Sequence, residues 1–233
     1  MQKTPPRTGS LYIVAVPIGN WDDITLRAIE TLRTADAIVC EEMRQGTTLL
    51  KRLDITPPEI ILLNEHNEAV MAPEILLRFF NGQSLALISD AGTPVFADPG
   101  HALIKLAAEA GVKVIPIPGP SSLMATLSVL DFPIQRFVFG GFLPRDERQR
   151  AQELQRLKAM RMPVVLMDTP YRLGKLLGEI SSAFGKNQLI MLACDLTLPT
   201  ETIYRGRVVD VQKWVGKRKA EFLLVTYPPG TTS

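Results

Sequence analysis

Cysteine, histidine and aromatic residues are scarce in this chain of 233 residues, which has two cysteines, two histidines and 6% aromatic side chains. Cys40 and Cys194 stand alone in apolar runs, without a CxxC pair or a Cys/His spacing. Isolated cysteines of this kind are typical of buried thiols in a reducing compartment. Neither histidine has a partner at metal-ligand spacing, so the sequence predicts no metal site and no disulfide.

Long hydrophobic runs are absent as well. Proline, glycine or a charged residue interrupts each apolar run before it reaches the roughly 20 residues of a membrane-spanning helix. Residues 1–10 are polar and proline-rich, without the apolar core of an export signal, and predict a flexible N-terminal tail. These absences predict a cytoplasmic protein that does not contact the membrane.

A strong excess of one charge is also missing. The chain has 26 basic and 24 acidic residues, and its formal net charge is +2. Nucleic-acid-binding proteins usually carry a larger basic excess, although local patches matter more than the sum. One such patch is predicted on a helix over residues 145–160, if its basic side chains share a solvent face: Arg145, Arg148, Arg150, Arg156 and Lys158, followed by Arg161. A solvated helix face is the commoner meaning of such a run.

The alternation of strand and helix patterns predicts an α/β fold, and over the first five strands, residues 11–115, it predicts a sheet that is parallel or mostly parallel. A proline-rich segment, residues 116–120, predicts a hinge between an N-terminal α/β unit over residues 11–117 and a C-terminal unit over 118–233. The predicted strands cover residues 11–16, 37–40, 60–63, 85–88 and 112–115, then 136–140, 164–167, 188–193, 202–205 and 221–226. Asp22 or Asp23 is the predicted cap of the first helix.

Three predicted strands are each followed by a loop of small residues: residues 17–20, 89–100 and 116–122. Open α/β sheets bind their ligands at the carboxyl ends of the strands. Small residues allow backbone groups to approach a ligand closely. No G-x-G-x-x-G follows the first strand, and neither a G-K-[ST] phosphate loop nor a G-x-S-x-G elbow is present. The loops therefore predict a nucleoside-type site, and the residue pattern alone leaves the nucleoside open.

These loops are part of a set of short sequence motifs that occur in the same order in a known family: Val-Pro-Ile-Gly-Asn (16–20), Asp-Ile-Thr-Leu-Arg-Ala (23–28), Glu-His-Asn-Glu (65–68), Ser-Asp-Ala-Gly-Thr-Pro (89–94), Asp-Pro-Gly (98–100), Pro-Ile-Pro-Gly-Pro-Ser (116–121) and Gly-Phe-Leu-Pro-Arg (141–145). With them the chain resembles the tetrapyrrole-methylase superfamily of S-adenosylmethionine-dependent methyltransferases. Within it, the chain is most similar to the branch that methylates small-subunit ribosomal RNA. The resemblance covers roughly residues 10–227.

The resemblance implies that S-adenosylmethionine binds in a cleft between two α/β units. Carried over residue by residue, the cofactor contacts fall on Pro17, Ala91, Gly92, Thr93, Phe96, Ala97, Ser121 and Ser122, and in the second unit on Met167, Leu196 and Ala220. Plain core packing is an equally good interpretation of Pro17 and Met167, and the two serines are also suited to cap a helix. The resemblance further implies a homodimer with ribosomal RNA or the small ribosomal subunit as its partner.

Methyl transfer to a ribose hydroxyl requires an aligned acceptor and a group that accepts its proton. The candidates are Asp90, His66 and Glu65, with Glu68 and Glu201 as further acids. For each acid, a hydrogen bond that stabilises a loop is the alternative. Arg27, Arg44 and Arg145 are suited to phosphates because a guanidinium offers forked donors.

The sequence also departs from the ribosomal branch. Met43 stands where the branch has threonine, Tyr171 where it has histidine, Leu198 where a basic residue is expected, and Ala220 where it has glycine. Fewer cations mean fewer phosphate contacts, which dominate affinity for RNA. Two alternatives therefore stand beside ribose 2′-hydroxyl methylation of ribosomal RNA: methylation of a corrinoid or porphyrin precursor, and a non-catalytic nucleoside-binding homologue.

Overall fold

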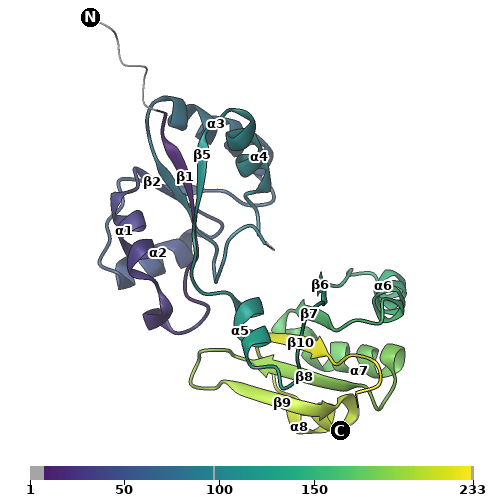
Figure 1. The fold of residues 1–233 in the computed structure, drawn as a ribbon. Helices are drawn as coiled ribbons and strands as arrows, with labels where there is room; N and C mark the ends of the chain where they lie inside the picture. The colour runs from purple at the N-terminus through teal and green to yellow at the C-terminus, as the bar shows by residue number, and fades with distance from the viewer. Residues whose placement is uncertain (1–7, 97, 232–233) are drawn as a thin grey trace, which may run out of the picture. The chain divides into compact units, whose positions relative to one another are not determined.

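The computed structural model describes residues 8–96 and 98–231, and the chain divides after Ser121 into two compact units (Figure 1). The sequence places this boundary four residues earlier, after Ile117. Most of the predicted N-terminal tail lies outside the described residues, and Ser10 is already the first residue of a strand. No helix in the described ranges is long and apolar enough to cross a membrane.

The first unit has a parallel sheet of five strands in the order β3-β2-β4-β1-β5. Its strands are β1 (Ser10–Val14), β2 (Ala37–Cys40), β3 (Ile60–Leu62), β4 (Leu85–Leu87) and β5 (Lys113–Ile117). Its helices are α1 (Leu26–Thr34), α2 (Met43–Arg52), α3 (Glu68–Phe80) and α4 (His101–Glu109). The prediction of a parallel sheet is thus confirmed for this unit.

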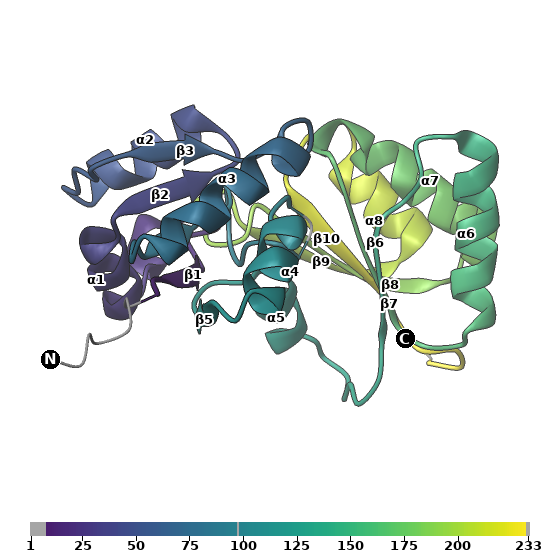
Figure 2. The same cartoon turned by 90° about the horizontal axis from the view of Figure 1, so that it is seen from above.

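Both faces of this sheet are buried, which explains its continuous apolar strands. Successive side chains of a strand point to opposite faces. Val39 therefore packs in the cluster that contains Phe79 of α3, whereas Ile38 packs with Leu32 of α1 and Leu50 of α2. Figure 2 shows α3 beside α4, and the two helices are in contact.

The predicted cap of the first helix is wrong. Thr25 caps α1, because its hydroxyl oxygen accepts a hydrogen bond from the Ala28 N–H at 3.1 Å. Asp22 lies in a short 3₁₀ turn, Trp21–Asp23, whose cap is the Asn20 side chain. Both aspartates lie in this turn, and α1 begins only after it.

The second unit has a mixed five-stranded sheet in the order β6-β7-β10-β8-β9, in which only the β6–β7 pair is parallel. Its strands are β6 (Val138–Phe142), β7 (Val164–Asp168), β8 (Leu189–Cys194), β9 (Thr202–Arg207) and β10 (Phe222–Thr226). Its helices are α5 (Ser122–Ser128), α6 (Glu147–Ala159), α7 (Leu173–Phe184) and α8 (Val208–Val215).

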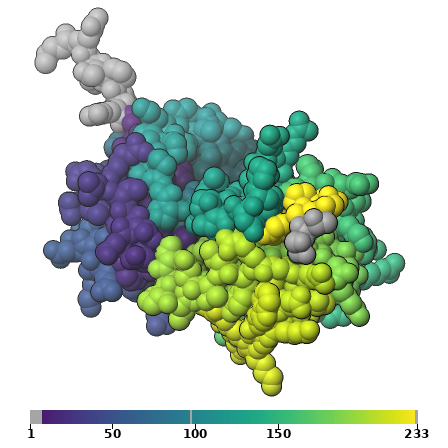
Figure 3. Space-filling model, turned by 60° about the horizontal axis from the view of Figure 1, so that its bottom comes forward, coloured from purple at the N-terminus to yellow at the C-terminus, as the bar shows by residue number. Residues whose placement is uncertain are grey.

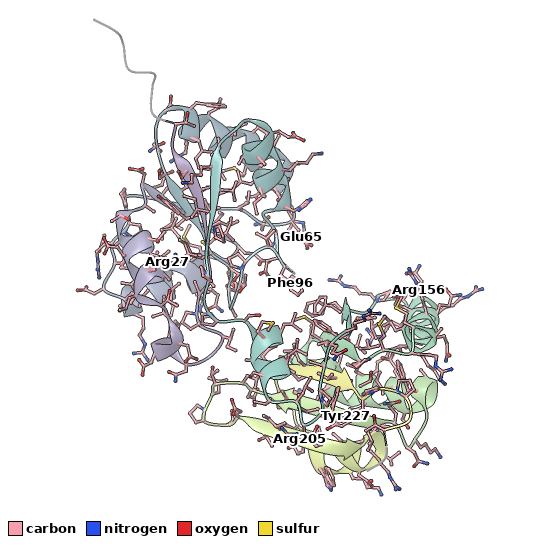
Figure 4. All side chains as sticks on the ribbon, in the orientation of Figure 1. Arg27, Glu65, Phe96, Arg156, Arg205 and Tyr227 are labelled. Carbon is pink, nitrogen blue, oxygen red and sulfur yellow. The ribbon has the colours of Figure 1, made fainter. Side chains whose placement is uncertain are left out.

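Helices α6, α7 and α8 cover one face of the second sheet and α5 covers the other. On the α5 side, the Phe132 and Tyr227 rings are in contact, with centroids 4.5 Å apart and planes tilted by 44°, and the Tyr227 hydroxyl donates to the Asp131 carboxylate. On the face shown in Figure 3, the yellow-green residues of β9 and α8 form much of the surface of this unit. The Arg205 side chain of edge strand β9 donates to the Val129 carbonyl at 2.7 Å (labelled in Figure 4).

The predicted basic face of the helix over residues 145–160 is wrong at Arg150. This side chain is 1% exposed, and its Nη2 lies 2.9 Å from Asp168 Oδ2 and 2.7 Å from Glu179 Oε2. It shares the buried face of α6 with Leu154 and Leu157, which are spaced four and seven residues from it, as one helix face requires. Arg156 remains exposed on the same helix (Figure 4).

Candidate functional site

The structure brings the three small-residue loops together at one edge of the first sheet. Because its strands are parallel, their carboxyl ends lie at the same edge. Val16, after β1, and Gly92, after β4, form an isolated antiparallel bridge with N–H to carbonyl distances of 2.9 and 3.1 Å. The Thr93 hydroxyl donates to the Pro120 carbonyl at 3.0 Å, which ties the β4 loop to the segment after β5.

Gly92 has a backbone conformation that suits glycine, with φ of +78°. A Cβ atom there would lie 3.1 Å from Ile18 Cγ2 and 3.7 Å from the Pro120 carbonyl oxygen. Its neighbours Ala91 and Thr93 are exposed and small. The Gly92 N–H and carbonyl are both bonded to Val16, so the backbone that a ligand can approach at this turn is that of Ala91 and Thr93. This arrangement fits a nucleoside-bearing cofactor held mainly through the main chain.

Replacing Gly92 with valine tests this arrangement. We expect Gly92→Val to weaken S-adenosylmethionine binding at least tenfold, or about 1.4 kcal/mol, because the branched side chain displaces the loop that approaches the ligand. Calorimetric titration measures the change. Gly111→Val is the matched control, since Gly111 also has positive φ, +71°, but a Cβ there meets nothing within 4 Å. Equal losses of affinity in both variants would show that backbone strain, and not the site, is responsible.

The other predicted cofactor residues of this unit take different positions. Pro17 is buried in the β1 loop, whereas Phe96 is exposed in the β4 loop. Ser121 is the last residue of the first unit, and Ser122 begins α5. Ala97 lies outside the described residues.

In the second unit, the three predicted contacts gather at one end of the sheet. Met167 pairs with Leu223 near the carboxyl end of β7. Leu196 follows β8 and Ala220 precedes β10, and the two segments are joined by the Asp195 N–H to Glu221 carbonyl bond of 2.8 Å. The segment after β8 is also fixed by Arg218, whose Nη2 lies 2.7 Å from Asp195 Oδ2. The sequence interpretation did not identify this arginine.

Carboxylates from three strands gather at the same edge of the first sheet. They are Glu41 and Glu42 after β2, Glu65 after β3, and Asp90 and Asp98 after β4. The pKa of Asp90 is raised, first by burial and then by the negative charge of Glu42, against a hydrogen bond from the Glu42 backbone. Burial and then the charge of Asp90 raise the pKa values of Glu41 and Asp98. Among the described residues, no Cys, His, Asp or Glu group is arranged to hold a metal ion.

Of the predicted proton acceptors, Asp90 is the one placed among the three loops. Glu65 and His66 lie beyond the edge strand β3, with 3.5 Å between Oε1 and Nε2, and their side chains are 78% and 84% exposed. Glu68 caps α4, since its Oε1 accepts from the Gly100 and Ala102 N–H groups at 2.9 and 2.8 Å. Glu201 accepts from the Thr197 N–H at 2.7 Å. The structure therefore favours the loop-stabilising alternative for Glu68 and Glu201.

The three predicted phosphate-binding arginines are all exposed but are not grouped within one unit. Arg27 lies on α1 and Arg44 in the first turn of α2, whereas Arg145 precedes α6 in the second unit. Figure 4 shows Arg27 well separated from Glu65 and Phe96 of the same unit. Arg145 follows a turn whose Leu143 and Pro144 carbonyls face Arg150 Nη1 at 3.5 and 3.3 Å.

Comparison with known proteins gives consistent matches over nearly the whole chain. The family model described as Tetrapyrrole (Corrin/Porphyrin) Methylases matches residues 10–212. The chain is 38% identical over 221 residues to "Ribosomal RNA small subunit methyltransferase I" of Xylella fastidiosa, covering 93% of this chain and 81% of that protein. The Escherichia coli O157:H7 protein of the same name is 37% identical over 221 residues, covering 93% and 77%.

Solved structures share the fold at low sequence identity. Uroporphyrin-III C-methyltransferase from Thermus thermophilus superposes with a TM-score of 0.61 at 22% identity, covering 94% of each chain. A cobalt precorrin-4 methyltransferase superposes with a TM-score of 0.65 at 21% identity, again covering 94% of each chain. These likenesses concern the arrangement of strands and helices.

Proposed function

The chain belongs to the tetrapyrrole methylase family, and from this premise we propose that it methylates a ribose 2′-hydroxyl of small-subunit ribosomal RNA. It is an S-adenosylmethionine-dependent methyltransferase. The observation that supports an RNA acceptor is the similarity to ribosomal RNA methyltransferases, which extends through both units at 37–38% identity.

The residues at the first-unit edge fit the cofactor, because Ala91 and Thr93 on either side of Gly92 are small and exposed, so a ligand can approach their backbone. We assign to the first unit and hinge the contacts Pro17, Ala91, Gly92, Thr93, Phe96, Ala97, Ser121 and Ser122, and to the second unit Met167, Leu196 and Ala220. S-adenosylmethionine supplies a methyl group already activated by positive sulfur. The loops then have to hold the acceptor in line and exclude water.

Asp90 is proposed to accept the proton of the ribose hydroxyl. It lies in the same loop as Ala91 and Gly92, and its raised pKa makes its carboxylate a stronger base than an ordinary aspartate. Glu65 and His66 are more distant along the sheet edge, so they are proposed to contact the RNA near the site. Arg27, Arg44 and Arg145 are proposed phosphate contacts.

Three of the four departures from the branch lie at the surface. Met43, Tyr171 and Leu198 are 39%, 79% and 39% exposed, so these substitutions change the surface and leave the core intact. They alter contacts with the acceptor more readily than the fold. Methylation of a corrinoid or porphyrin precursor and non-catalytic nucleoside binding remain the outcomes against which the proposal is tested.

The deciding experiment incubates the protein with radiolabelled S-adenosylmethionine and either small ribosomal subunits or corrin precursors. Label in ribosomal RNA, mapped to a ribose by nuclease digestion, supports the proposal. Label only in the corrin precursor would replace it with the small-molecule function. Cofactor binding without label in either acceptor would support the non-catalytic alternative.

A cytoplasmic homodimer is part of the same proposal. Closed twofold pairs are the commonest assembly of soluble oligomers, and ribosomal subunits are the proposed partner. The described residues include no helix able to span a membrane, which agrees with a partner of this kind.

Removing the exposed arginines at the start of α6, Arg145 just before it and Arg148 in its first turn, tests the RNA interaction. Each arginine that binds a phosphate should, when replaced, reduce the slope of log affinity against log salt by about 0.7–0.9. We therefore expect Arg145→Gln with Arg148→Gln to weaken RNA binding and to flatten this slope by roughly 1.5, with cofactor affinity unchanged. Filter binding across a salt series measures it. Lys213→Gln, which changes an exposed cation of α8, is the control. An unaltered slope in the double variant would mean that the start of α6 is solvated and does not bind RNA.

A further inference from the structure

A small pocket opens beside the candidate cofactor loop, entirely within the first unit. Its volume is about 170 Å³, and the β1 loop, the β4 loop, α2 and the 3₁₀ turn at Trp21 form its walls. Its lining includes Pro17, Trp21, Gln45, Leu49, Asp90 and Ala91. Pro17 and Ala91 are also proposed cofactor contacts, so the pocket adjoins the cofactor site.

The lining combines one aromatic ring with polar groups that are available to a ligand. The Arg52 guanidinium lies over one face of the Trp21 indole, 5.6 Å from the ring centroid, so the opposite face is the one that can stack on a ligand. Gln45 is exposed and lines the pocket, and its amide offers both donors and an acceptor. Ser89 is different, because its hydroxyl already lies 3.2 Å from the carbonyls of Ala91 and Gly92.

An aromatic face with an adaptable polar edge is how proteins hold unstacked bases. Single-stranded RNA is recognised by stacking its bases on aromatic side chains and by hydrogen bonds to their edges. Enzymes that act on one nucleotide place its base in a close-fitting pocket of this kind. Pockets for drug-sized ligands measure roughly 300–1,000 Å³, so a tetrapyrrole macrocycle is too large for this one and a single base is a suitable size.

We propose that this pocket receives the unstacked base of the acceptor nucleotide, with Trp21 as the stacking surface and Gln45 as the reader of the base edge. The inference rests on the proposed function, because it assigns the acceptor's base to a place beside the reacting ribose. Asp90 lines the same pocket, so a base held there leaves its ribose next to the proposed proton acceptor. Neither Trp21 nor Gln45 was among the residues singled out from the sequence.

The natural fluorescence of Trp21 provides a direct test. The chain has two tryptophans, and Trp214→Phe leaves Trp21 as the only indole. We expect at least one of the four nucleoside 5′-monophosphates, and a short oligonucleotide of the same base, to quench this fluorescence saturably, both alone and with S-adenosylhomocysteine already bound. Gln45→Ala should weaken the binding about fivefold, because it removes the hydrogen bond to the base edge. Gln152→Ala, an exposed amide on α6, is the matched control and should bind normally.

Three results would overturn the assignment of this pocket to the acceptor base. They are no saturable quenching by any of these probes, an affinity of the Gln45→Ala variant equal to that of the unsubstituted protein, or displacement of the nucleotide by S-adenosylhomocysteine. The last would assign the pocket to the cofactor. Methylation of small ribosomal subunits, measured in parallel, separates this inference from the proposed function. Quenching without methylation removes the RNA function and keeps a nucleotide pocket, whereas methylation without quenching keeps the function and removes the pocket.

Discussion

Replacing Arg150 with methionine is expected to lower the free energy of unfolding of the second unit by roughly 3–5 kcal/mol, the usual cost of removing one partner from a buried ion pair. The substitution removes the Arg150 cation from Glu179 and from Asp168, which is only 4% exposed and keeps the longer contact to Arg172, 4.0 Å between Oδ1 and Nη1. It also removes the donor that faces the Leu143 and Pro144 carbonyls. Urea unfolding followed by circular dichroism measures the decrease.

Two further variants separate the electrostatic cost from a packing defect. Arg148→Met changes an exposed arginine of the same helix and should alter stability by no more than about 0.5 kcal/mol. Combining Arg150→Met with Asp168→Asn and Glu179→Gln removes the uncompensated charges, so this triple variant should regain part of the stability. A triple variant no more stable than Arg150→Met alone would assign the cost to poorer packing.

Arg150 also shows where local sequence pattern stops being informative. Strand and helix positions follow from the period of apolar residues, and the predicted bounds of β2 agree with the structure. A charged residue inside such a pattern is normally assigned to solvent. The spacing of Arg150 to Leu154 and Leu157 predicts the buried face instead, but its two carboxylate partners come from β7 and α7, and no local pattern records that pairing.

Part of the candidate site could be predicted from the sequence and part of it could not. The β4 loop could be predicted because its glycines, prolines and aspartates all lie within one short stretch of the sequence, residues 89–100. The cluster of carboxylates at the sheet edge and the small pocket could not be predicted. Their residues come from separate strands and helices, and tertiary packing decides which of these become neighbours. The available signal was that Glu41 and Glu42 directly follow a predicted strand, and that parallel strands end at a common edge.

The proposed proton acceptor predicts a large effect on the chemical step. A positioned acid or base usually contributes about 10²–10⁴-fold in rate, so Asp90→Asn should lower kcat by about that factor. Cofactor affinity should change little, because the asparagine keeps the shape of the loop. Single-turnover methylation of small ribosomal subunits measures the rate, and calorimetry measures the affinity. Asp98→Asn, which changes another acid of the same loop region, should retain most of the activity.

The pH dependence identifies the acid. The carboxylate form is the active base, so the rate should rise with pH through the pKa of Asp90, which burial and the charge of Glu42 hold above the ordinary aspartate value. Asp90→Asn should abolish this acidic limb. Glu42→Gln should move it to lower pH, because removing the neighbouring negative charge makes Asp90 easier to ionise. A limb that persists unchanged in Asp90→Asn would place the proton acceptor elsewhere, with Glu65 and His66 as the next residues to replace.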